Sequence, residues 1–298
     1  MFYFEDGNVH FRIKNTVYKL YRSRLIQKSP VLRTMLSLPT TAHLAESASG
    51  QDLEDGSSDE RAFRLDRWGR QVTTTEFDHL LSFIHPDYDP HTPVSLTRLV
   101  DALKQSHYFD IIDIKEMVTL QLNGRPDLKP ALRLFLARTC LIYDWIEPAI
   151  RQILQDPFDT LTFGDVELIG LPALHPIECA RAQILRHRGR CAVVAPRPMH
   201  SPIWCLPDRS RCEDAWLDAW WGGFNRQGIA LALLHPDHPV PGSTIIQRLP
   251  QLDTGAMSER CRELTLQELC GTEDQRSKLL KEEDIIEATV VKVRKTML

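Results

Sequence analysis

The sequence predicts an α+β fold, in which a small sheet flanked by helices is followed by an all-α domain. Three observations predict this class. Residues 9–20 alternate apolar and polar side chains, as half-buried strands do. Beyond residue 74, apolar residues recur at helical spacing in most segments. Glycine and proline interrupt that spacing at residues 123–126, which predicts domains of residues 1–124 and 125–298.

Composition narrows the class of protein. The chain has 298 residues, of which 43% are hydrophobic and 26% charged, values typical of a folded domain protein. A net charge of −4 gives no general attraction to nucleic acid or to an anionic membrane. No apolar run reaches the ~18 residues of a membrane span, and the N-terminus lacks a signal-peptide pattern. We therefore expect a protein of the cytosol or nucleus, whose seven cysteines stay reduced.

The first elements are a hairpin and two short helices. Val9, Phe11 and Ile13 alternate with polar residues before a turn at Lys14, and a second strand follows. Ser23 is the expected N-cap of the first helix, and Ser29 precedes a proline at the start of the second. The second helix should bury one apolar stripe, consisting of Val31, Leu32, Met35, Leu36 and Leu38.

The next segments are an insertion, a strand and more helices. Residues 39–60 are rich in small polar and acidic residues and contain no Lys or Arg, which predicts a disordered acidic insertion. Residues 62–66 alternate and should add a strand to the hairpin. Thr73 and Glu76 can cap a third helix, and two closing helices should meet at Tyr108. The third helix has an apolar stripe of Phe77, Leu80, Leu81 and Ile84.

Taken in order, these segments resemble a BTB/POZ domain, in its divergent fungal form. The pattern falls on Asp6, Gly7, Asn8, Val9, Arg22, Ser23, Leu25, Ser29, Pro30, Val31, Arg33, Met35 and Leu36. Tyr21 stands where many BTB domains have His. The resemblance covers about residues 2–122. It implies a non-enzymatic interaction module that forms homo- or hetero-oligomers. It also implies an adaptor of a cullin-type ubiquitin ligase or a transcriptional corepressor scaffold, and the sequence does not choose between them.

The resemblance also implies a partner surface at the turn after the third helix and on the helices that follow. The candidate partner-binding residues are His85, Asp87, Tyr88, Tyr108 and Phe109. Tyr88 is favoured, because it lies between two aspartates, and a tyrosine can bury its ring while its hydroxyl stays hydrated. For Tyr108 and Phe109, packing inside the domain is the alternative and the commoner role of aromatic residues at helix junctions.

The second domain is predicted to be mostly helical. Leu134, Leu141 and Trp145 should lie on one face of the first two helices, with Asp144 as the cap of the second. Residues 163–190 form a further helical run, and repeated prolines predict an extended connection at residues 192–211. A later helix should bury the tryptophans Trp216, Trp220 and Trp221.

No motif for catalysis or for a phosphate- or dinucleotide-binding loop occurs, so we expect no enzyme activity and no cofactor. Residues 181–190 hold a basic cluster, which suggests an alternative function as a zinc-stabilised nucleic-acid-binding regulator. A solvated helix end explains the cluster more simply, because cations are favoured near a helix C-terminus.

The cysteines offer one further chemical hypothesis. Cys205, Cys212 and Cys261 are candidate metal ligands. The resemblance implies a fourth cysteine ligand at position 258 in related fungal sequences, where this chain has Ser258, a poor zinc ligand. The residues that could substitute for it are Met257, Cys270 and His235. Independent buried cysteines and no bound metal are the favoured interpretation.

Overall fold

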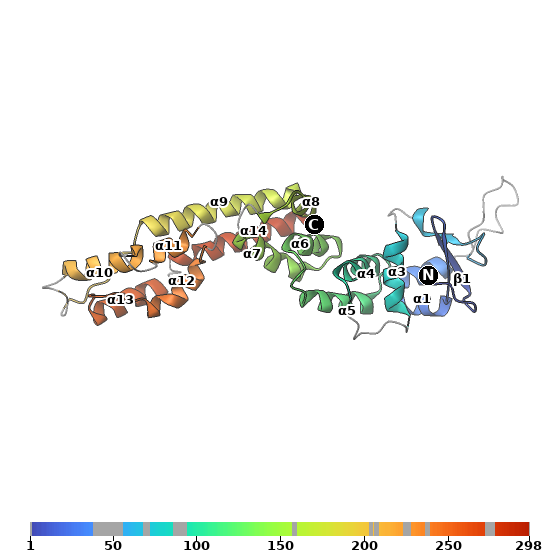
Figure 1. The fold of residues 1–298 in the computed structure, drawn as a ribbon, viewed down its shortest axis with the longest axis horizontal. Helices are drawn as coiled ribbons and strands as arrows, with labels where there is room; N and C mark the ends of the chain where they lie inside the picture. Colours follow the sequence, from blue (N-terminus) through green and yellow to red (C-terminus); the bar gives the residue numbers. More distant parts are fainter. Residues whose placement is uncertain are drawn as a thin grey trace. The chain divides into compact units, whose positions relative to one another are not determined.

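The computed structural model describes residues 2–37, 56–67, 72–85, 94–156, 160–202, 205, 209–222, 228–235, 239–271 and 278–297. The chain divides into two compact units, Met1–Lys129 and Pro130–Leu298, and Figure 1 gives the order of their elements. Unit 1 contains a sheet and helices, while the described part of unit 2 is helical, so the α+β class is confirmed. Among the described residues, no helix has the length and hydropathy needed to cross a bilayer.

The sheet of unit 1 is built on the predicted hairpin. β1 (Val9–Ile13) and β2 (Thr16–Leu20) pair antiparallel, with Phe11 opposite Tyr18, and Lys14 in the turn has φ 51°. β3 (Phe63–Arg64) pairs parallel with β1, which gives the strand order β2-β1-β3. Phe11 and Tyr18 are fully buried, because the apolar face of the hairpin packs on the helices.

Two short helices follow the hairpin, α1 (Arg22–Lys28) and α2 (Pro30–Ser37). Ser29 caps α2 as predicted, since its Oγ accepts a hydrogen bond from the Leu32 amide at 2.9 Å and donates one to the Phe109 carbonyl. The predicted cap at Ser23 is wrong, because α1 begins at Arg22 with Tyr21 as its N-cap, two residues earlier, and Ser23 lies inside the helix. Val31 is 37% exposed rather than buried, because α2 turns Leu32, Met35 and Leu36 inward instead.

Part of the predicted insertion is structured. Within residues 39–60, residues 56–60 belong to the described part of the chain, and the rest lie outside it. The Gly56 carbonyl accepts a hydrogen bond from the His10 amide at 2.9 Å, and the Gly56 amide donates to Arg61 at 2.7 Å. Gly56 has φ 70°, and a Cβ there would lie 2.4 Å from the Phe63 ring. The expectation of disorder is therefore wrong for residues 56–60, because the Gly56 backbone bonds to His10 of β1 and the Asp59 carbonyl accepts a hydrogen bond from the Arg12 side chain.

Three longer helices complete unit 1, namely α3 (Thr74–Ile84), α4 (Leu96–Tyr108) and α5 (Ile112–Asn123). The predicted capping box is confirmed, because the Thr73 side chain accepts from the Glu76 amide at 3.2 Å and the Glu76 carboxylate accepts from the Thr73 amide at 3.2 Å. The predicted stripe of α3 is buried as well. Aromatic rings of the sheet and helices meet in the core, where Phe77 lies 5.1 Å from Tyr18 and 6.1 Å from Phe109 between ring centroids.

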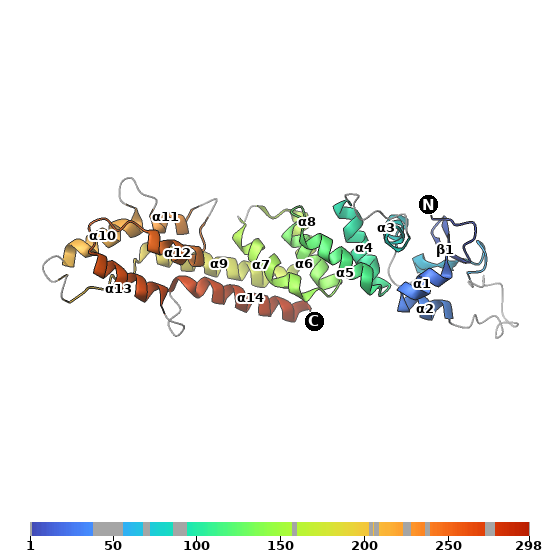
Figure 2. The same cartoon turned by 90° about the horizontal axis from the view of Figure 1, so that it is seen from below.

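Unit 2 is built from helices. They are α6 (Pro130–Thr139), α7 (Ile146–Gln155), α8 (Phe163–Ile169), α9 (Leu171–Val193), α10 (Arg209–Trp221), α11 (Ile229–Leu233), α12 (Gly242–Arg248), α13 (Glu259–Cys270) and α14 (Lys281–Met297). Figures 1 and 2 both show α9 and α14 side by side and antiparallel. A buried ion pair between Arg188 of α9 and Glu282 of α14 joins them, with the Arg188 Nε 3.2 Å from the carboxylate.

Several predicted details of unit 2 differ. Asp144 lies in a 3-10 turn rather than at a cap, since α7 begins at Ile146 after Trp145. Leu141 is 51% exposed at φ 55°, because the chain reverses there and turns the side chain outward. The predicted connection at 192–211 is shorter than expected, because α9 continues to Val193 and α10 begins at Arg209.

Candidate functional site

The residues predicted to bind a partner have different positions in unit 1. His85 is 3% exposed, and its ring stacks on Phe2 at 5.6 Å and lies 4.7 Å from the Phe4 ring. Phe109 is 1% exposed in the core, and Tyr108 is half-buried against it. His85 and Phe109 are thus core residues, because the rings of Phe2 and Phe4 cover His85 and the ring of Phe77 on α3 covers Phe109. Asp87 and Tyr88 lie outside the described residues, and their role stays a prediction.

An exposed apolar strip lies on the helix that follows Tyr108. On α5, Ile114, Val118 and Leu122 face the core, while Ile112 and Leu120 are 59% and 74% exposed. Helical spacing contained this signal, since positions 112 and 120 are eight residues apart and therefore share the face opposite the buried stripe.

The basic cluster at 181–190 has partners within unit 2. The Arg181 Nη2 donates to the Ile153 carbonyl at 2.7 Å, and Arg188 is buried against Glu282. Arg186 and Arg190 line an open pocket of about 390 Å³, together with Lys281 and the acidic Asp284. Half of this cluster therefore holds helices together instead of facing a ligand.

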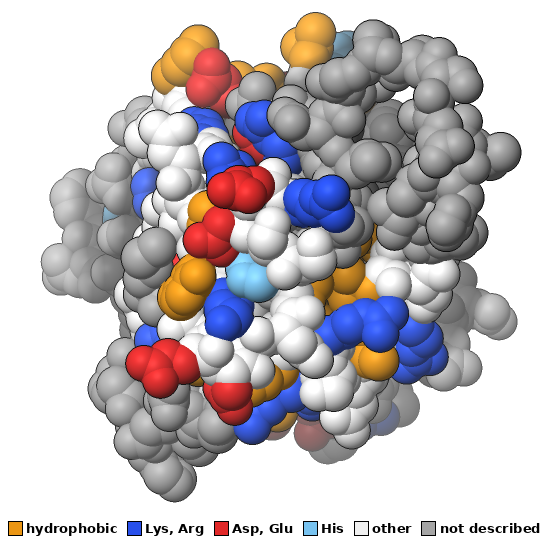
Figure 3. Space-filling model, turned by 90° about the vertical axis from the view of Figure 1, so that its right-hand side faces the viewer, with side chains coloured by type: hydrophobic (Ala, Val, Ile, Leu, Met, Phe, Trp, Pro, Cys, Tyr) orange, Lys and Arg blue, Asp and Glu red, His pale blue; other side chains and the backbone are white. Residues whose placement is uncertain are grey.

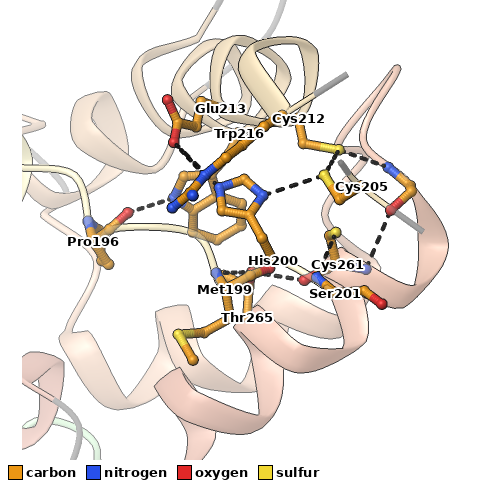
Figure 4. Close-up of polar contacts among 12 residues, drawn as sticks. Pro196, Met199, His200, Ser201, Cys205, Cys212, Glu213, Trp216, Cys261 and Thr265 are labelled. Carbon is orange, nitrogen blue, oxygen red and sulfur yellow. Dashed lines mark hydrogen bonds and ion pairs between the residues drawn. The ribbon is translucent and has the colours of Figure 1, made fainter. Parts of the chain in front are cut away.

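The three candidate cysteines come from three segments of unit 2 and lie close together. Cys205 lies in the connection between α9 and α10, Cys212 in the first turn of α10 and Cys261 in the first turn of α13. The Sγ atoms of Cys205 and Cys212 are 3.4 Å apart. His200, which the sequence did not suggest, joins them with its Nδ1 3.3 Å from the Cys205 Sγ. We call these four residues the thiol–histidine cluster (Figure 4).

The connection is held in place by its own polar contacts. Prolines prevent it from becoming a helix, and the Pro196 carbonyl accepts from the Trp216 Nε1 at 2.7 Å. The Met199 amide donates to the Thr265 Oγ1 of α13 at 2.9 Å. His200 is thus placed between α10 and α13 by the residues on its N-terminal side.

The cluster lies at the end of an apolar core. The described residues of this core are Cys205, Cys212, Trp216, Trp220, Ile229, Leu233, Ile245, Leu249, Met257, Cys261 and Leu279. Cys205, Cys212 and Cys261 are at most 3% exposed. Trp221, in contrast to the prediction, is 45% exposed, because α10 turns only Trp216 and Trp220 into the core.

Backbone amides and a carboxylate surround the donors. The Ser201 amide donates to the Cys261 Sγ at 3.3 Å, and the Ser258 amide donates to the Cys212 Sγ at 3.4 Å. The other ring nitrogen of His200, Nε2, lies 3.2 Å from the Glu213 Oε1. Figure 4 shows the His200 ring between this carboxylate and Cys205.

Proton affinities differ among these thiols. Burial, followed by contacts with Cys212 and Cys261, raises the pKa of Cys205 to about 12. For Cys261, burial acts in the same upward direction, but hydrogen bonds from Ser258 and the Ser201 amide outweigh it and lower the pKa. The pKa values of these two neighbouring thiols are therefore shifted in opposite directions.

The residues considered as a fourth ligand have other positions. His235 and Cys270 are exposed, and Met257 belongs to the apolar core. Ser258 is the N-cap of α13, and its Oγ accepts from the Cys261 amide at 3.3 Å. His200 was missed because its side chain reaches the thiols only after the connection folds back, although its position five residues before Cys205 was a usable signal.

Comparison with protein-family models, with curated proteins and with solved structures finds no match for this chain.

Proposed function

We propose that this chain is a non-enzymatic interaction protein, and that unit 1 is a BTB/POZ-like module that binds a protein partner. The order of elements in unit 1 supports this proposal most. A hairpin, two short helices, a strand beside β1 and then three longer helices follow one another as the resemblance implies. An adaptor of a cullin-type ubiquitin ligase and a corepressor scaffold both fit such a module.

The polar pairs of unit 1 also support a role in binding rather than in chemistry. The His79 Nδ1 lies 2.8 Å from the Asp101 carboxylate and joins α3 to α4. Lys28 of α1 pairs with Asp113 of α5. These pairs connect neighbouring elements. Figure 3 shows that, on one face of the molecule, positive and negative side chains are interleaved.

The exposed strip on α5 is the surface that we assign to the partner. Ile112 and Leu120 are large apolar side chains in water, with Glu116 between them on the same face. Apolar side chains with a polar rim form the core of many protein interfaces.

The test compares the full chain with the variant Ile112→Glu/Leu120→Glu. Sedimentation velocity measures self-association, and calorimetry measures binding to a purified cullin scaffold. We expect the wild type to show at least one of the two associations. In the variant, the affinity of that association should fall about 30-fold or more, because two charges would enter an apolar contact. Leu185→Glu is the matched control, since Leu185 is 66% exposed on a helix of unit 2. A wild-type chain that neither self-associates nor binds the scaffold contradicts the proposed function.

The alternative, a nucleic-acid-binding regulator, has less support. Arg181 and Arg188 are engaged by a carbonyl and a carboxylate, so fewer cations remain for phosphates than the sequence suggests. Binding of the pure chain to duplex DNA, measured at two salt concentrations, tests it. Steeply salt-dependent binding would favour the alternative over the adaptor.

A further inference from the structure

The thiol–histidine cluster has the chemistry of a metal site. It brings together three sulfurs and one imidazole nitrogen, the ligands that zinc uses in closed structural sites. The donor atoms of His200, Cys205 and Cys261 all lie within 4.8 Å of one another. Cys212 is not in this group, but its Sγ lies 3.4 Å from the Cys205 Sγ, so a shift of its side chain toward the other donors would make it a fourth ligand.

Two of the donor separations suit tetrahedral coordination. Zinc–sulfur bonds of ~2.3 Å at tetrahedral angles place two sulfurs about 3.8 Å apart, and a sulfur and a nitrogen about 3.6 Å apart. The observed separations of 3.4 Å between sulfurs and 3.3 Å between Cys205 and His200 are close to these values.

The surroundings point to bound thiolates rather than to buried thiols. Two backbone amides, of Ser201 and Ser258, donate to sulfur atoms, and amide donors stabilise negative charge on a metal-bound sulfur. Cys261 lies in the first turn of a helix of twelve residues, where the helix dipole also favours a thiolate. Three thiols that gather in a core without a cation cannot all ionise, because their charges would repel.

The histidine has the orientation that metal ligands show. Glu213 accepts from the Nε2 side of the ring, at 3.2 Å, so the Nδ1 lone pair can be directed toward the thiols. A carboxylate on the outer nitrogen of a ligating histidine fixes its tautomer and raises its basicity. Arg209 lies 3.6 Å from the same Glu213 oxygen and holds the carboxylate in turn.

We propose that His200, Cys205, Cys212 and Cys261 bind one Zn²⁺ ion in a closed tetrahedral Cys₃His site. The three thiols lose their protons to solvent when they bind as thiolates, and the imidazole binds neutral through Nδ1. No ligand position is left for water, so the ion has a structural role. It ties the connection to α10 and α13, which lie far apart in the sequence.

The first experiment measures metal in the full chain. The protein is stripped with a chelator, loaded with Zn²⁺ and desalted, and its metal content is determined by mass spectrometry. We expect one equivalent in the wild type. Loading with Co²⁺ should give the visible bands of tetrahedral cobalt and the ultraviolet bands of thiolate-to-cobalt charge transfer. Retention of no metal, or octahedral cobalt bands, overturns the proposal.

Variants assign the ligands. Cys212→Ser and His200→Ala should lose the retained zinc, while Cys140→Ala and Cys270→Ser should keep it. Cys140 is the stringent control, since it is a buried cysteine of the same unit outside the cluster. If zinc content is the same in Cys212→Ser and Cys140→Ala, the assignment of ligands is wrong.

Two further measurements keep the proposal testable if ligand variants do not fold. In the wild type, zinc should protect three thiols from a chromogenic thiol reagent, and a chelator should expose them. Equal thiol reactivity with and without zinc overturns the proposed site. A Cys205–Cys212 disulfide, detected as a loss of two hydrogens in the mass of protein purified under reducing conditions, overturns it as well. Glu213→Ala should weaken zinc affinity by ~10–100-fold, whereas Glu259→Ala, a carboxylate on the surface of α13, should leave it unchanged.

Discussion

At the scale of single residues, burial decides how much a side chain contributes to unfolding free energy. Leu32, Met35 and Leu36 were identified from helical spacing and are buried. Val31 was assigned to the buried face of α2, and Trp221 to the buried face of α10, but both side chains are exposed. Helical spacing predicts the centre of an apolar stripe. Whether a residue at the edge of the stripe is buried depends on how the neighbouring element packs, and a single sequence does not show that packing.

The first prediction concerns core leucines of unit 1. Leu81→Ala and Leu36→Ala should lower the unfolding free energy by about 2–5 kcal/mol, because each removes buried methyl groups and leaves a cavity. Leu81 is fully buried and Leu36 is 9% exposed, so the larger loss belongs to Leu81. Thermal unfolding of the full chain measures both. Leu120→Ala, at a site 74% exposed, is the control and should change stability by less than ~0.5 kcal/mol.

The second prediction concerns the buried pair of unit 2. Glu282→Ala leaves Arg188 buried without its carboxylate and should cost about 3–5 kcal/mol. Glu283→Ala is the control, because Glu283 pairs with Arg151 at a site where both side chains are about 30% exposed, which should cost at most ~1 kcal/mol. Denaturant unfolding of both variants gives the difference, and equal costs would show that the Arg188 pair does not stabilise unit 2.

At the scale of elements, the sequence predicted those that local rules determine. The β1–β2 hairpin follows from alternation, and the capping box at Thr73 from the spacing of two polar residues. The start of α1 and the length of α9 were placed wrongly, because packing extends helices past the residues that favour their ends. Residues 56–60 were taken for disordered chain on composition, whereas the Gly56 backbone bonds to His10 of β1, an interaction that composition does not describe.

The third prediction separates the two parts of the predicted insertion. Deleting residues 42–54 should leave the melting temperature nearly unchanged, because their composition cannot bury enough apolar surface to offset the entropy of ordering. Deleting residues 42–58 also removes Gly56 and its hydrogen bonds to His10, which should cost roughly 1–3 kcal/mol. Scanning calorimetry of both deletions checks this, and similar melting temperatures would mean that Gly56 contributes little.

At the scale of the whole molecule, two units with separate cores imply two unfolding transitions. Zinc binding to the native state stabilises only the unit that holds the site. The fourth prediction is therefore that a chelator lowers the melting temperature of one calorimetric transition of the full chain and leaves the other unchanged. Cys212→Ser should reproduce the effect without chelator. A shift of both transitions, or of neither, contradicts a structural ion confined to unit 2.

Only part of the candidate site could be predicted from the sequence. Cys205, Cys212 and Cys261 were considered as metal ligands through the resemblance to fungal sequences, while independent buried cysteines were the favoured interpretation. Their meeting with His200 depends on a proline-rich connection that folds back across α10 and α13, and no local pattern encodes that path. For the partner surface, the burial of Phe109 agrees with the commoner role of aromatic residues at helix junctions, whereas the rings of Phe2 and Phe4 that cover His85 lie about 80 residues away in the sequence, where no local pattern indicates the contact.

The tryptophans around the thiol–histidine cluster give unit 2 an optical signal of its own. Of the six tryptophans, Trp145, Trp204, Trp216, Trp220 and Trp221 belong to unit 2, so intrinsic fluorescence of the unlabelled chain reports mainly on that unit. Trp216 lies one helical turn after Cys212, within the same core. A cobalt ion at the cluster would therefore quench the emission by energy transfer, whereas zinc, which absorbs no visible or near-ultraviolet light, would leave it bright. The difference in brightness between the two metals would make site occupancy visible in real time, as the ion enters and leaves.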